Sequence, residues 1–97
     1  MKTLKEIEEK IKNIRGKVYV RMRLINVREY GTAYHGEDEP MNNSLGWLVG
    51  LGMAKGIFST YQNGINDTKK EIVLASPPYP KTPYEQGIKE ALEWCLG

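Results

Sequence analysis

Apolar residues recur every three or four positions at the start of the chain. This stripe consists of Leu4, Ile7, Ile11 and Ile14. Such spacing is typical of one face of an α-helix. Thr3 and Glu6 have the spacing of a capping box, and Gly16 is a residue type that often follows the last helical turn. The pattern predicts a helix from about residue 4 to residue 15.

Residues 17–27 alternate between apolar and polar side chains instead. The apolar set is Val18, Val20, Met22 and Leu24, and the other set is Lys17, Tyr19, Arg21 and Arg23. Alternation with many β-branched residues is typical of a strand that has one face on a core. The segment is therefore predicted to be a strand whose outer face is basic.

The rest of the chain predicts two helices and a hairpin. Residues 44–55 are apolar on all sides and rich in glycine, which favours a buried helix over the alternative, a glycine-broken strand. Residues 57–62 and 71–75 are interpreted as the strands of a hairpin. A last helix is predicted to start after Thr82, its N-cap. Pro83 stands in the first helical position, and Glu85 follows the cap by three residues.

These elements together predict a single α+β domain over residues 1–97. Its sheet would have three to four mostly antiparallel strands, with the N- and C-terminal helices packed on one face. The last helix has an apolar stripe wider than one core contact needs, and a chain this short buries a modest core. We therefore expect a homo-oligomer.

The charge of the chain is unevenly distributed. Residues 1–35 contain nine Lys and Arg against four Asp and Glu, whereas residues 36–97 contain five against eight. Asymmetry of this kind can mark a binding surface, or two parts of a subunit that meet in an assembly. A third interpretation is a solvated strand face, where Lys and Arg discourage edge pairing.

The basic segment suggests a site for an anion. Arginine forks match phosphate and carboxylate, and neighbouring aromatic rings can stack on a base. The predicted ligand-binding residues are Arg21, Arg23, Arg28, Tyr19, Tyr34 and His35. The leading hypothesis is a non-enzymatic protein that sequesters or senses an anionic, phosphate-bearing small ligand such as a nucleotide. Nucleic acid is less favoured, because the pI of 8.7 lies below the value of about 9 typical of such domains.

Two other functional classes stay open. The chain could be a small inhibitor or adaptor that binds another protein, of the kind that viruses and mobile elements encode. It could also be a small hydrolase that uses His35 with a carboxylate from Glu37 to Glu39. An inhibitor or adaptor needs no catalytic residue, and the sequence as a whole favours a binding protein over an enzyme.

Cofactors, metals and membranes have little support in the sequence. The lone Cys95 excludes an intrachain disulfide framework and a multi-cysteine zinc site. The charged N-terminus is unlike a signal peptide, and the longest uncharged apolar stretch, residues 45–54, is too short to span a bilayer. We therefore expect a cytoplasmic protein without metal or cofactor.

Overall fold

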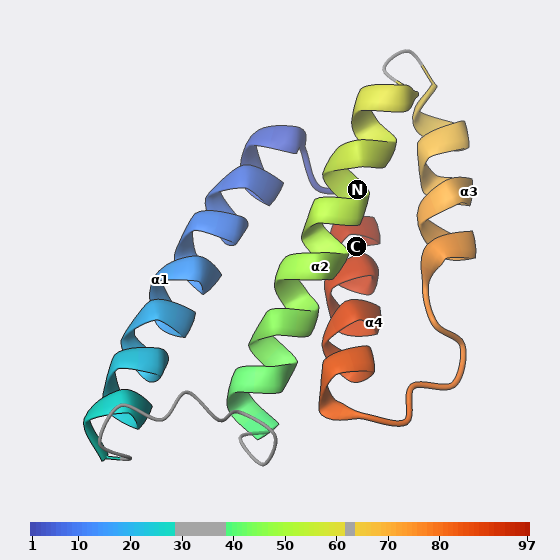
Figure 1. Ribbon diagram of the computed structural model, residues 1–97. Coiled ribbons are helices and arrows are strands. Elements are labelled where there is room, and N and C mark those ends of the chain that lie inside the picture. The colour runs from blue at the N-terminus through green and yellow to red at the C-terminus, as the bar shows by residue number, and fades with distance from the viewer. Residues whose placement is uncertain (29–38, 62–63) are drawn as a thin grey trace.

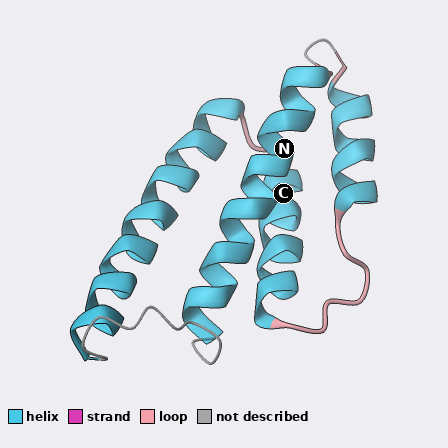
Figure 2. Ribbon diagram, viewed as in Figure 1, coloured by secondary structure: helices cyan, strands magenta, loops and turns pink. Residues whose placement is uncertain are grey.

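The computed structural model describes residues 1–28, 39–61 and 64–97, with side-chain positions for all of these except 22–28 and 39. In the described residues the chain forms four helices and no strand (Figures 1 and 2). They are α1 (Leu4–Arg28), α2 (Glu39–Thr60), α3 (Ile65–Ala75) and α4 (Pro83–Leu96). The predicted α+β class, with its sheet and hairpin, is therefore wrong.

The long central helix α2 organises the fold. Helix α1 lies along one side of α2, α4 packs behind it, and α3 stands on the other side (Figure 1). A core of apolar side chains from all four helices fills the space between them. Its buried members are Ile7, Ile14, Val18, Met41, Leu51, Ala54, Ile72, Ala91, Leu92 and Cys95.

Helix α1 starts where the sequence predicts and ends much later. The Thr3 hydroxyl accepts a hydrogen bond from the Glu6 N–H at 3.2 Å, and the Glu6 carboxylate accepts from the Thr3 N–H at 3.2 Å. The Thr3 hydroxyl also donates to this carboxylate, and the hydrogen bonds from the Thr3 backbone and hydroxyl lower the pKa of Glu6, the backbone bond most strongly. The predicted capping box is therefore present, but α1 runs on through Gly16 to Arg28.

The predicted strand over residues 17–27 is thus part of α1. The stripe of Ile7, Ile11 and Ile14 continues four residues later with Val18, which is buried on the core. This contact needs helical spacing, and it outweighs the alternation seen in the sequence. Gly16 weakens a helix by about 1 kcal/mol relative to alanine, which the packing of its neighbours offsets.

Helices α2 and α3 also replace predicted irregular or extended structure. The helix predicted for residues 44–55 is confirmed, but α2 is longer than predicted and begins at Glu39. Residues 57–60 are the last turn of α2, and residues 71–75 belong to α3. Buried Thr68 donates a hydrogen bond to the Gly64 carbonyl at 2.9 Å, which fixes the start of α3.

Helix α4 has the predicted start. The Thr82 hydroxyl accepts a hydrogen bond from the Glu85 N–H at 3.1 Å, and Pro83 stands in the first turn. The Glu85 carboxylate accepts from the Lys81 N–H at 3.1 Å rather than from the cap residue. Because α4 packs along α2, its wide apolar stripe is accounted for within one chain. That stripe no longer supports a homo-oligomer, which stays a prediction.

Glycines bring α2 and α4 into backbone contact. A Cβ atom at Gly46 would overlap the carbonyl of Tyr84, and one at Gly87 would overlap the carbonyl of Asn43. At Gly50 it would lie 2.8 Å from the Cβ of Ala91. Both helices therefore contribute glycines to one interface, and a side chain at any of the three would push them apart.

A tryptophan pair joins the N-terminal segment to α2 and α4. The rings of Trp47 and Trp94 meet edge to face with their centroids 6.2 Å apart. The Lys10 ammonium lies 5.4 Å from both ring centroids, and that of Lys2 lies 5.2 Å from the Trp94 ring. The Lys2 N–H also donates to the Cys95 carbonyl at 2.8 Å, which places the two ends of the chain together (Figure 1).

We expect Gly46→Ala and Gly87→Ala each to destabilise the protein by about 1–3 kcal/mol, because the new methyl group meets backbone that cannot rotate away. Gly52→Ala is the matched control in α2, since a Cβ there meets nothing within 4 Å. That variant should be neutral or gain up to about 1 kcal/mol. Urea unfolding measures all three, and equal effects at the three positions would contradict the close contact.

Candidate anion-binding groove

Of the six predicted ligand-binding residues, the structure describes the side chains of Tyr19 and Arg21 alone. Tyr19 and Arg21 lie on α1 with exposed side chains. Arg23 and Arg28 belong to the same helix, but their side chains lie outside the described residues, as do Tyr34 and His35. Because positions two apart in a helix do not share a face, Arg21 and Arg23 are not neighbours as the predicted strand required.

Most of the carboxylates that were considered for catalysis also lie outside the residues that the structure describes. Glu37 and Asp38 are not described, and Glu39 is the first residue of α2. Among the side chains that the structure does place, no three His, Cys, Asp or Glu gather closely enough to hold a metal ion. The proposed pairing of His35 with a carboxylate therefore stays a prediction.

Cys95 is placed as a core residue rather than a nucleophile. Its side chain is fully buried in the interface of α4. Burial raises its pKa to about 11, against a smaller opposite effect of the Lys2 ammonium. Because the thiolate is the reactive form, a thiol with this pKa is almost wholly unreactive at neutral pH.

A hollow lies on the exposed side of α1, next to Arg21. It measures about 550 Å³, and its described lining is Asn13, Gly16, Lys17, Val20 and Arg21. Its surface consists almost wholly of apolar atoms, so the charged ends of Lys17 and Arg21 contribute little to it. An anion would find few donors here.

A second groove, between α1 and α2, has the opposite character. It measures about 410 Å³ and is lined by Glu8, Ile11, Lys12, Arg15 and Lys55. Polar and apolar atoms share its surface, with the aliphatic Ile11 among three cations and one carboxylate. We call this set the basic groove. Its excess of positive charge makes it the described surface best suited to an anion.

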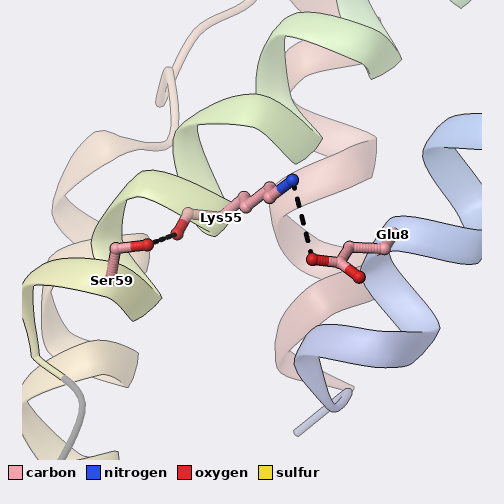
Figure 3. Close-up of polar contacts among 3 residues, drawn as sticks. All are labelled: Glu8, Lys55 and Ser59. Atoms are coloured by element: carbon pink, nitrogen blue, oxygen red, sulfur yellow. Dashed lines mark hydrogen bonds and ion pairs between the residues drawn. The ribbon is translucent and has the colours of Figure 1, made fainter.

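Two helices build the basic groove from opposite sides. Glu8, Lys12 and Arg15 follow each other at spacings of four and three on α1, so they share a face beside the core stripe. Lys55 comes from α2, where it follows the buried Ala54. Figure 3 shows Lys55 reaching from α2 across to Glu8 on α1.

The carboxylate in the basic groove is already paired. The Lys55 ammonium lies 3.6 Å from the Glu8 carboxylate, and each side chain is about half exposed, at 50% and 49%. The Ser59 hydroxyl donates to the backbone carbonyl of Lys55 at 3.2 Å (Figure 3). Within the described side chains, no carboxylate lies within ion-pair distance of Lys12 or Arg15. Two cations are thus available to an anion from outside.

Sequence reasoning missed Lys55 and the role of Lys12. Both sit outside the segment from Arg15 to Arg28 that drew attention by its charge, and Lys55 is an isolated cation within an apolar run. The helix predicted over residues 4–15 already places Lys12 and Arg15 on one face, but it does not show that this face meets Lys55. Lys55 comes close to these residues because α2 packs against α1, and the pattern of residues along the sequence does not predict that packing.

Comparisons with known proteins do not assign the groove. The chain matches no described protein family, and neither curated proteins nor solved structures show significant similarity to it. The four helices that the structure describes include none with the length and apolar character needed to cross a membrane.

We expect Glu8→Gln to change the free energy of unfolding by less than about 1 kcal/mol, because an ion pair between half-exposed side chains is worth little. Glu93→Gln is the matched control, since Glu93 pairs with Lys89 on α4 at 3.8 Å. Urea unfolding should give similar small effects for both. A loss of several kcal/mol in Glu8→Gln alone would mean that the pair holds α1 and α2 together.

Proposed function

We propose that this chain is a non-enzymatic binding protein for a phosphate-bearing ligand, which it holds in the basic groove. The observation that carries the proposal is the excess of positive charge in this groove. Lys12, Arg15 and Lys55 line it together with one carboxylate, Glu8, and that carboxylate is paired with Lys55. This keeps the class of ligand that the sequence suggests and moves the site from a strand face to the groove between two helices.

The chemistry of the three cations suits phosphate. Arg15 offers a planar fork that can bind two phosphate oxygens at once, and the two lysines act as mobile point charges. Ile11 gives the groove an apolar patch against which a non-polar part of a ligand can rest. The one carboxylate among the described residues of the groove, Glu8, is paired with Lys55, which favours binding without turnover.

The expected affinity for a small ligand is low. Exposed ion pairs contribute up to about 1 kcal/mol each, so three cations give a single phosphate at most about 3 kcal/mol. A dissociation constant of 1 mM corresponds to about 4.1 kcal/mol. A lone phosphate group should therefore bind at millimolar or weaker affinity, and less tightly as salt screens the charges.

A role in protein binding is the second candidate, and a different surface favours it. Val73 and Leu74 of α3 are 57% and 68% exposed, and Tyr79 in the segment after α3 is 83% exposed. Neighbouring apolar side chains at the surface are common at protein interfaces. Leu74→Ser should leave anion binding unchanged, because α3 lies across the molecule from α1 (Figure 1).

We expect inorganic pyrophosphate, titrated at low ionic strength, to shift the amide resonances of Ile11, Lys12, Arg15 and Lys55 in nitrogen-15 NMR spectra. Lys12→Ala/Arg15→Ala should weaken this binding by about two- to thirtyfold, as expected for two exposed charge contacts. Glu8→Gln should strengthen it, because it frees Lys55 from its carboxylate.

The control removes the same charge elsewhere. Lys69→Ala/Lys70→Ala changes two exposed lysines of α3, away from the groove. This variant should bind pyrophosphate like the unmodified protein. If both double variants weaken binding equally, or if the shifted resonances lie outside the groove, the proposal is wrong.

A further inference from the structure

The cations of the basic groove belong to a longer line along α1. The line consists of four residues that share one face of α1, because they are spaced seven, three and four positions apart: Lys5, Lys12, Arg15 and Tyr19. All four side chains are exposed, and the Tyr19 ring is 62% exposed. At 1.5 Å per residue the line is about 21 Å long. Arg23 is the next position in the series, with its side chain outside the described residues.

Opposing charge on this face is confined to one turn of α1. Glu8 and Glu9 both lie three or four residues from Lys5 and Lys12, and Lys55 of α2 pairs with Glu8 across the groove. Beyond that turn the line continues with the cations Lys12 and Arg15 and ends at Tyr19, and Lys5 stands at its other end. A row of separated positive charges matches a ligand whose negative charges are also in a row.

We infer that the ligand of the basic groove is a single-stranded nucleic acid whose backbone runs along this face of α1. The inference rests on the proposed function and names its ligand. A stacked strand carries a phosphate about every 3.4 Å, so 21 Å spans about six phosphates, enough for every cation of the line. A single phosphate cannot reach Lys5 and Arg15 together.

Tyr19 distinguishes nucleic acid from other linear anions. An exposed aromatic ring beside cations is a platform on which an unpaired base stacks, whatever its identity. A duplex offers no unpaired base to such a ring, which favours a single strand. An acidic peptide would use the same cations but would gain nothing comparable from the ring.

The test is fluorescence anisotropy with a labelled oligothymidine of about twelve nucleotides, a length within the range that single-strand sites cover. This strand should bind at least about tenfold more tightly than thymidine monophosphate under the same conditions. The logarithm of its binding constant should fall with the logarithm of salt concentration with a slope of about −2 to −3, as expected when three or four phosphates are contacted.

Two sets of variants separate charge from stacking. Lys12→Ala/Arg15→Ala should reduce the size of the salt slope by about 1.4, because two phosphate contacts are lost. Tyr19→Leu should weaken binding by about fivefold or more and leave the slope unchanged, whereas Tyr19→Phe should keep the affinity. Lys69→Ala/Lys70→Ala controls for net charge, and circular dichroism checks that each variant is helical.

The outcomes also separate this inference from the proposed function. If pyrophosphate shifts the groove resonances but the strand binds no more tightly than the monophosphate, the inference is overturned and the proposed function stands. If neither ligand binds, both are wrong. Equal binding of a polyglutamate peptide of the same charge, or no effect of Tyr19→Leu, would overturn the assignment to nucleic acid.

Discussion

The backbone contact between α2 and α4 is the constraint on which the rest of the structure depends. Gly46 and Gly50 on one helix and Gly87 on the other let the two main chains touch, and no other residue type fits at the points of overlap. Asn43 reinforces the contact by donating to the Glu90 carboxylate at 2.7 Å. Close-packed helices of this kind have one allowed register, because a slip of one residue would replace a glycine with a side chain.

That register decides where the charges meet. With α4 on one side of α2, the remaining side of α2 is available to the apolar stripe of α1, and Ile7, Ile14 and Val18 become buried. This packing brings Lys55 to Glu8 at the border of the core. The basic groove is thus a consequence of helix packing, and Lys55 comes from a segment 40 or more residues away in the sequence from Lys12 and Arg15.

The features that the sequence predicts correctly are those fixed by near neighbours. The capping box at Thr3 and Glu6 and the N-cap at Thr82 depend on hydrogen bonds across three residues, and both are present. Among the glycines of the predicted buried helix, Gly46 and Gly50 meet α4 closely, whereas a Cβ at Gly52 would meet nothing within 4 Å.

The failures lie where distant contacts decide. Val18 fits both an alternating strand and the continuation of the helical stripe from Ile14, and local pattern does not choose between them. Contact of Val18 with the core selects the helix and offsets the cost of Gly16 within it. Once residues 17–28 are helical, Arg21 and Arg23 belong to different faces of α1 instead of one sheet face. The strand face on which the predicted ligand site was based is therefore absent.

The account therefore depends most on α1 remaining a helix beyond Gly16. Backbone NMR measures this directly, through the Cα and Cβ chemical shifts of residues 14–21 and the contacts between Hα and the Hβ three residues later. The account predicts helical shifts that continue without interruption through Gly16 and Lys17 to Arg21, with those contacts present. Extended shifts from Lys17 onward, together with cross-strand contacts, would contradict it and restore the predicted sheet.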